Sequence, residues 1–241
     1  MPPTTLLLPT TTPPSYTHAS IPPALTALTR LFATHNLPLT IAPTTPSALS
    51  TFLSPTPDPF APYTLLLLVH SAGDFLPASL LPSFDAFLRR GGALVAIHGA
   101  ATGLPSHPPY GAALGGVFKR HPPPSLSTVQ IVQPGHPIIS GSLGRGRGMR
   151  QNPDDDGGWE WDWFDEWYEF EADPRGQAGV EVLISGGGQG AGYPVAWCRE
   201  AVAGERGRVF YTALGHFDEA YEDEGFMAQV LGGVMWAAGD K

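Results

Sequence analysis

The stretch GGALVAIHGAA at residues 91–101 decides the fold class. Five apolar residues, 93–97, follow a glycine pair without interruption, which is typical of a strand buried on both faces of a parallel sheet. One polar residue, His98, ends the run, and three small residues come after it. Small residues let the next helix begin close to the sheet, so a tight strand-to-helix turn displays the polar side chain. We therefore expect an α/β fold with His98 at a strand end.

Strands and helices alternate from residue 4 to this stretch, and the second half of the chain is less regular. Such alternation indicates a doubly wound α/β sheet. No internal repeat or domain boundary interrupts it, so we expect a single domain over residues 1–241. The apolar spacing predicts strands at 4–8, 37–42, 63–69, 126–132, 166–170, 180–184, 193–198 and 208–212, and helices at 21–35, 47–53, 77–90, 110–118 and 225–238.

Composition excludes several classes of protein. The 13 Lys and Arg against 22 Asp and Glu give a net charge of −9, which argues against a nucleic-acid binder. The single cysteine, Cys198, excludes an internal disulfide framework and a cysteine-rich zinc site. Pro9 interrupts the first apolar run too early for a signal peptide, and no later run approaches the roughly 18 residues of a membrane span. We expect a cytoplasmic protein without membrane or nucleic-acid partners; homo-oligomerisation stays open.

A low-complexity segment lies in the second half of the chain. Residues 141–158 are rich in glycine and carry three arginines followed by three consecutive aspartates. We expect a mobile surface insertion that extends over about 141–164. Its last part, WEWDWF at 159–164, has tryptophans that suit sugar stacking or a protein interface, although a loop packed over the fold's own edge is the commoner outcome.

Histidines follow several predicted strands. His18, His70, His98 and His216 each stand at or just after a strand end. Ligands of an open parallel sheet bind at the carboxyl ends of its strands, so these side chains are candidates for one site. The alternative for His98 is a simple hydrogen bond to a backbone carbonyl.

Other candidate residues have less specific patterns. In DEWY at 165–168, Glu166 and Tyr168 should share one face of a strand, and a carboxylate beside aromatic rings suits a general base with a raised pKa or a sugar-hydroxyl ligand. An ordinary amphipathic strand explains the same pattern. Asp74 follows a strand end and could bind substrate, but Asp is also a common residue at a helix start. His121 is a candidate for catalysis, but it could equally stabilise a helix C-terminus. We interpret Cys198 as a small core residue.

These residues belong to a series of segments that resembles the ThuA-like family, named for trehalose utilisation. The resemblance runs in order over nearly the whole chain. The segments are YTH at 16–18 with SIP at 20–22, GD at 73–74, GGALVAIHGA at 91–100, FKRHP at 118–122, GHPI at 135–138, DEWY at 165–168, PVAWCR at 194–199 and GRVFYTALGH at 207–216.

The resemblance implies a class I glutamine amidotransferase-like fold, which is a flavodoxin-like three-layer sandwich with a mostly parallel sheet. His98 stands where amidotransferases of this fold carry their cysteine, so glutamine hydrolysis is not expected. The proline-rich beginning and the insertion before Asp165 depart from the family pattern.

The family's link to disaccharide catabolism through 3-keto sugars implies a carbohydrate-active enzyme of lyase, isomerase or hydrolase type. A ketone acidifies the neighbouring C–H bond, so such an enzyme needs a base and an oxyanion donor. We expect His98 and Glu166 as acid and base, with His18, His121 and His216 holding hydroxyls or the oxyanion. The expected substrate-binding residues are Asp74, Tyr168, Trp197 and Arg199.

Two alternatives of other kinds stay open. Three imidazoles and a carboxylate could bind zinc or manganese and make the protein a metal-dependent hydrolase, although no short His-x-x-x-His spacing supports this. No cofactor is otherwise indicated. The chain could also be a non-catalytic module that binds a sugar or a protein partner.

Overall fold

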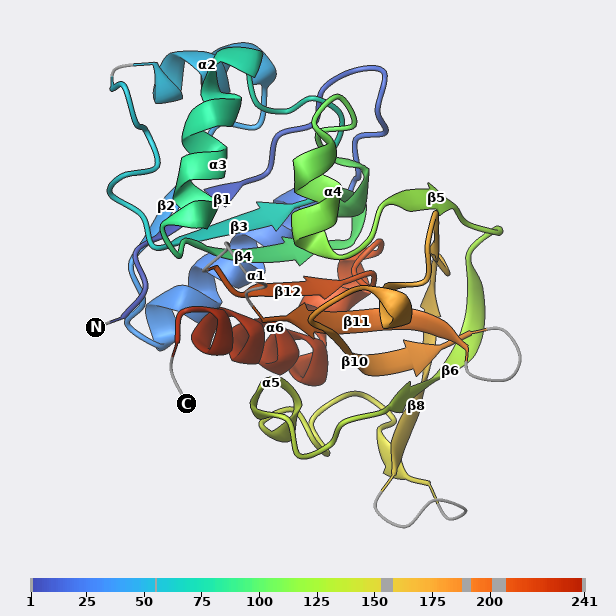
Figure 1. The fold of residues 1–241 in the computed structure, drawn as a ribbon. Helices are drawn as coiled ribbons and strands as arrows, with labels where there is room; N and C mark the ends of the chain where they lie inside the picture. Colours follow the sequence, from blue (N-terminus) through green and yellow to red (C-terminus); the bar gives the residue numbers. More distant parts are fainter. Residues whose placement is uncertain (1, 55, 153–157, 188–191, 201–206, 240–241) are drawn as a thin grey trace.

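The computed structural model describes residues 2–54, 56–152, 158–187, 192–200 and 207–239. Within them, one ten-stranded sheet has helices on both faces (Figure 1). One half of the sheet consists of parallel strands, and the other half is antiparallel. In spatial order the strands are β2 (Leu39–Ile41), β1 (Thr5–Leu8), β3 (Leu65–Val69), β4 (Ala93–Ile97), β12 (Val209–Thr212), β11 (Tyr193–Arg199), β10 (Val180–Gly186), β6 (Ser125–Ile131), β8 (Trp159–Asp165) and β7 (Arg150–Gln151).

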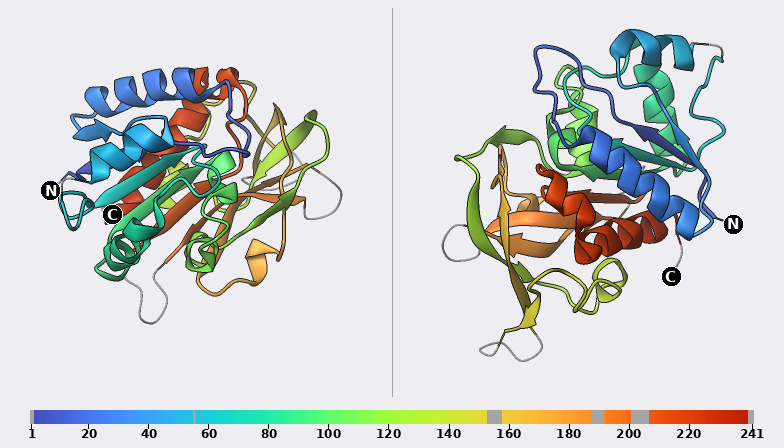
Figure 2. Two further views of the ribbon diagram at one scale, coloured as in Figure 1. Left: turned by 90° about the horizontal axis from the view of Figure 1, so that it is seen from above. Right: turned by 180° about the vertical axis from the view of Figure 1, so that it is seen from behind.

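The helices form two layers that enclose the parallel half. Figure 2 shows α1 and α6 on one face of the sheet, and α2, α3 and α4 cover the other face in Figure 1. A short antiparallel pair, β5 (Phe118–Arg120) and β9 (Glu169–Phe170), lies apart from the large sheet. The helices are α1 (Ile21–Thr34), α2 (Pro46–Leu53), α3 (Leu81–Arg89), α4 (Pro108–Leu114), α5 (Pro137–Ser140) and α6 (Glu224–Ala237).

Alternation along each parallel strand builds the two cores. Leu7 and Leu67 pack with the side chains of α1 and α6, whereas Leu6 and Leu66 pack with those of α2, α3 and α4. Successive side chains of a strand point to opposite faces, so a strand covered on both sides must be apolar throughout. Each fully buried leucine contributes about 1.5–3 kcal/mol to folding. The uninterrupted apolar runs of the sequence are therefore a direct consequence of the three-layer arrangement.

The sheet is less parallel than expected. Among the described strands, four neighbouring pairs are parallel and five are antiparallel. Parallel neighbours need a long crossover, usually a helix. Between α4 and α6 the four-residue α5 is the only α-helix of the described residues, so no long helical crossover is present there and β6, β8, β10 and β11 pair antiparallel.

The structure also differs from the prediction of a surface insertion over about 141–164. Residues 159–164 form most of β8, which pairs with β6 over seven residues. Trp159, Trp161 and Trp163 alternate with acidic residues, which is the period of a strand, and Trp161 is buried in the core. Arg147 is held by a bond from its amide to Asp223 Oδ2 (2.7 Å). The aspartates at 154–156 lie outside the described residues.

Two further element boundaries were wrong. The helix expected at 110–118 ends at Leu114, because Gly115 adopts a left-handed φ of 83° that terminates it. The strand expected at 166–170 is reduced to β9, and Glu166 lies between β8 and β9. No helix in the described part of the chain has the length and hydropathy to cross a bilayer.

Candidate active site

Four histidines meet at the carboxyl ends of the parallel strands. His18 follows β1, His70 follows β3, His98 follows β4 and His216 follows β12. The backbones of His70 and His98 have φ values of 54° and 49°, which non-glycine residues adopt only when the surroundings enforce them. In His98 this conformation begins the 3-10 turn His98–Thr102 and directs the ring away from the strand into the cluster.

The ring of His98 is fully buried, and both of its nitrogens have partners. Nδ1–H donates to the carbonyl of Ala213 (2.6 Å). Nε2 is therefore the nitrogen that faces the site. The hydroxyl of Tyr168 lies 2.9 Å from this nitrogen, and Nδ1 of His216 lies 3.2 Å from it. The carbonyl bond considered from the sequence is thus present, but it leaves the second nitrogen facing the cluster.

Glu166 joins three of the imidazoles. Its Oε2 lies 3.3 Å from His98 Nε2 and 3.2 Å from His216 Nδ1, and its Oε1 lies 3.4 Å from His121 Nε2. Burial alone would raise the pKa of Glu166, but hydrogen bonds from His216 and His98 outweigh it and hold this pKa well below its ordinary value. The raised pKa expected from the aromatic neighbours is therefore wrong in direction.

Two other groups of the cluster respond to the same environment. Burial lowers the pKa of His216, but the hydrogen bond and charge of Glu166 reverse this and make the net shift upward. Burial raises the pKa of Tyr168 well above its usual value, so its hydroxyl keeps its proton.

His18 and His70 form the most enclosed part of the cluster. Their rings stack with centroids 4.2 Å apart, and the ring of His18 lies edge-on to those of His98 and His216. Burial and the neighbouring imidazoles lower the pKa of His18 to about 3. Nδ1 of His18 is buried without a hydrogen-bond partner among the described residues. His70 Nε2 instead contacts the hydroxyls of Tyr221 (2.9 Å) and Ser20 (3.2 Å).

A pocket of about 620 Å³ opens over this cluster. Its walls combine imidazole, carboxylate and hydroxyl groups with aromatic rings, a mixture suited to the polar edges and apolar faces of a sugar. The residues that line it are Ser15, Tyr16, His18, Thr102, Phe118, His121, Glu166, Tyr168 and His216.

The structure brings six of the nine expected site residues together. His18, His121, His216, Glu166 and Tyr168 line the pocket, and His98 contacts three of them from behind. The side chain of Asp74 instead accepts bonds from the amide and hydroxyl of Ser106.

Trp197 and Arg199 do not reach the pocket. Trp197 is fully buried and donates Nε1–H to the carbonyl of Leu114 (2.8 Å). Arg199 is buried as well, and its guanidinium donates to the carbonyls of Ala113 and Ala178. Both side chains of β11 thus donate hydrogen bonds to backbone carbonyls, two in α4 and one just before β10. This corrects their expected role in substrate binding.

The family model for ThuA, described as trehalose utilisation, matches residues 6–237. The chain belongs to the ThuA family. A search of curated proteins found no significant match.

Several solved structures have a similar fold. A thua-like protein from Bacteroides uniformis ATCC 8492 is 20% identical, with a TM-score of 0.69 over 97% of this chain and 91% of that one. A thua-like protein from Parabacteroides merdae ATCC 43184 is 19% identical, with a TM-score of 0.68 over 99% and 91%. The cytoplasmic protein STM3548 from Salmonella typhimurium is 9% identical, with a TM-score of 0.59 over 97% and 98%. At these identities the structures establish the fold alone.

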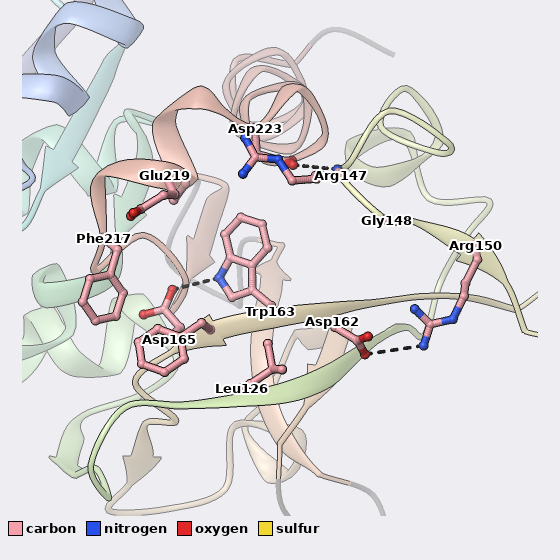
Figure 3. A pocket seen from close by; sticks show the side chains of 12 residues that line it. Leu126, Arg147, Gly148, Arg150, Asp162, Trp163, Asp165, Phe217, Glu219 and Asp223 are labelled. Atoms are coloured by element: carbon pink, nitrogen blue, oxygen red, sulfur yellow. Dashed lines mark hydrogen bonds and ion pairs between the residues drawn. The ribbon is translucent and has the colours of Figure 1, made fainter.

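A second cavity of this ThuA-family chain, of about 650 Å³, is lined by residues next to those of the site (Figure 3). Asp165 and Phe217 line it, whereas their chain neighbours Glu166 and His216 line the first pocket. Asp165 Oδ2 accepts bonds from Trp163 Nε1–H and from the amide of Gly215. The carboxylate of Asp165 therefore connects the two segments that carry Glu166 and His216.

Several contributors to the site have weak signals in the sequence. His70 stands at a strand end, which is the signal shared with His98, but nothing in the sequence ranks it above other histidines. Tyr221 and Ser20 hold His70 from distant segments, and Ser15 and Thr102 line the pocket without any motif. Phe118 lines it from the FKRHP segment, in which only His121 is a candidate by its chemistry. Only the assembled fold identifies these residues.

Proposed function

We propose that this ThuA-family protein is an enzyme of carbohydrate catabolism that moves a proton at the carbon next to the ketone of a 3-keto sugar. The observation that supports the proposal is Glu166, which contacts three imidazoles at the base of one pocket. Such a cluster provides proton donors and acceptors within reach of a bound sugar. The trehalose-utilisation family of the chain supports the choice of substrate class.

The contacts favour His121 as the group that exchanges the substrate proton. Its side chain is 32% exposed, so it can return protons to water. Nδ1–H donates to the carbonyl of Pro122 (2.9 Å), and Nε2 faces both the pocket and Glu166 Oε1. His98 is fully buried behind Glu166, so we revise its role from acid or base to positioning the cluster.

In the proposed reaction, His121 Nε2 takes the proton from the carbon beside the ketone, and the C–H electron pair moves onto the keto oxygen as an enolate. The protonated hydroxyl of Tyr168 donates a hydrogen bond to that oxygen. Return of the proton to the same carbon gives exchange. Where that carbon carries a hydroxyl, transfer of the hydroxyl proton to the enolate oxygen gives an enediol; removal of the proton from the other hydroxyl and protonation of the former ketone carbon then move the ketone, which is isomerisation. Where the next carbon carries a leaving group, the enolate electrons re-form the ketone and expel that group with its bonding pair, which is a lyase reaction.

We also propose that the parallel half is flavodoxin-like. The order β2-β1-β3-β4-β12 supports this, because it matches the 2-1-3-4-5 order of that fold.

The test is deuterium wash-in next to the ketone of 3-keto-trehalose and 3-keto-glucose, followed by proton NMR in D₂O. Wild-type protein should exchange the proton, and His121→Ala should lower the rate by about 10²–10⁴-fold, the range for removal of a general base. Asp74→Asn, which alters a carboxylate outside the pocket, should leave the rate unchanged. Ligand line-broadening without any wash-in would contradict the proposal and favour a sugar-binding module.

A further inference from the structure

Three donor atoms at the base of the pocket form a nearly equilateral triangle. His98 Nε2, His216 Nδ1 and Glu166 Oε2 are separated by 3.2, 3.2 and 3.3 Å. In a tetrahedral site with bonds of roughly 2.0–2.1 Å, neighbouring ligand atoms are about 3.3–3.4 Å apart. The three atoms therefore already have the spacing of ligands around one zinc-sized ion.

One cation at the centre of the triangle can interact with all three atoms at once. Nδ1–H of His98 donates to Ala213, so Nε2 is the nitrogen that faces Glu166 and His216. Two imidazole nitrogens and one carboxylate oxygen are ligand types that zinc sites use.

The surroundings also have the features of a metal site. A histidine that binds metal through one nitrogen usually donates the other N–H to a carbonyl or carboxylate, as His98 does to Ala213. The three donor residues are buried or nearly so, and a ligand atom of His18 lies within 4.8 Å of theirs. Nδ1 of His18 is a buried ring nitrogen without a partner among the described residues.

We propose that His98 Nε2, His216 Nδ1 and Glu166 Oε2 bind one divalent transition-metal ion, zinc foremost, with a fourth position beside His18 that is open to a substrate oxygen. Three protein ligands and one open position are the arrangement of catalytic zinc. Metal binding would displace the hydroxyl of Tyr168 from His98 Nε2 and free it to donate to the substrate.

A second group of possible metal ligands has a proton where a metal would need a lone pair. His136, Glu181 and Cys198 also come close together. Nδ1 of His136 accepts a hydrogen bond from the amide of Ile138 at the start of α5, so the neutral ring carries its proton on Nε2. That N–H points at the sulfur of Cys198 (3.6 Å) rather than leaving a lone pair for a metal. We therefore assign the metal to the first group.

The role of the ion in catalysis rests on the proposed function. A divalent cation that binds the keto oxygen acts as a Lewis acid, which acidifies the neighbouring C–H bond and stabilises the enolate. His121 is not one of the three ligands, so it remains free to exchange the proton.

The direct test is a metal titration that contains no sugar. Tag-free protein is stripped with a chelator and titrated with Co²⁺, followed by visible absorption, and Zn²⁺ is then added in competition. We expect one equivalent to bind. Glu166→Gln and His216→Asn keep the side-chain shapes and should each lower the affinity by at least about 100-fold, since loss of an outer-shell partner alone costs 10–100-fold. His35→Ala, at an exposed histidine, should change nothing.

Three results would overturn the proposal. The first is substoichiometric binding, and the second is binding that survives both Glu166→Gln and His216→Asn in folded protein. The third is binding that Cys198→Ser abolishes, because this would locate the metal in the second group. Failure of the proposed function is separate, since stoichiometric binding without deuterium wash-in would leave the metal site in place. Unchanged wash-in by chelator-treated protein would show that the metal takes no part in the reaction.

Discussion

Gly99 controls how closely the 3-10 turn approaches His18. A Cβ at this position would lie 2.8 Å from Cε1 and 3.3 Å from Nδ1 of the His18 ring, with the backbone of His70 3.4 Å away. The φ of Gly99 lies outside the left-handed region, so Gly99→Ala adds no backbone strain. The substitution therefore acts by steric pressure on His18.

The size of the displacement follows from these contacts. Ordinary carbon contacts begin near 3.4 Å, so His18 must retreat by 3.4 − 2.8, or about 0.6 Å, because the backbone of His70 prevents the new methyl from withdrawing. Such overpacking costs about 1–3 kcal/mol in stability. A functional group needs placement within about 0.5 Å, so we expect the metal affinity to fall by about 10-fold, the lower end of outer-shell effects.

The assay combines urea unfolding with the Co²⁺ titration. Gly103→Ala is the matched control, since its Cβ would lie 2.8 Å from both Phe75 Cε1 and the carbonyl of Ser71, outside the histidine cluster. This control should lose at least as much stability as Gly99→Ala while keeping wild-type metal affinity. Equal affinity loss in both variants, or an unchanged affinity in folded Gly99→Ala, would refute the role assigned to this contact.

Three further predictions concern the framework of the site. Trp197→Phe leaves the carbonyl of Leu114 without its donor, so the free energy of unfolding in urea should fall by about 1–3 kcal/mol while deuterium wash-in persists. Loss of wash-in without loss of stability would instead support Trp197 as a substrate ligand. Asp223→Ala removes the N-cap of α6 and the acceptor of the Arg147 amide. We expect its free energy of unfolding, measured in urea, to fall by about 2–4 kcal/mol, and that of Asp223→Asn to fall by less. Burial raises the pKa of Cys198 to about 12, so at about pH 8 the native thiol should react with a disulfide reagent far more slowly than the unfolded chain, with a rate that climbs as pH rises; equal rates would show that Cys198 is accessible.

Asp165 offers a structural explanation for how the site keeps its geometry. Its carboxylate accepts hydrogen bonds from Trp163, from the amide of Glu166 and from the amide of Gly215. These contacts join the end of β8 to the loop after β12, which are far apart in the chain. Groups that act together must be held within a few tenths of an ångström, and buried charge-assisted bonds supply that constraint.

The parallel half of the fold could be predicted well from local patterns. Apolar runs located β1, β3 and β4 to within two residues, because a strand covered on both faces must be apolar along its whole length. The antiparallel half was harder to predict. The low-complexity stretch before residues 159–164 predicts an insertion there, whereas their tryptophans alternate with the period of β8. Composition and periodicity gave conflicting signals there, and pairing with β6 decided the outcome.

The sequence by itself determined which strands end in polar side chains, and thereby that His18, His98 and His216 would meet at one edge of the sheet. Only the tertiary structure decided that Glu166 lies between them, that Nε2 of His98 faces Glu166, and that Trp197 and Arg199 serve the core. The physical reason is that periodicity reports whether a face is buried, which is a local property. The partners that share that buried space come from segments far away in the chain, and their distances exist only once the sheet has formed.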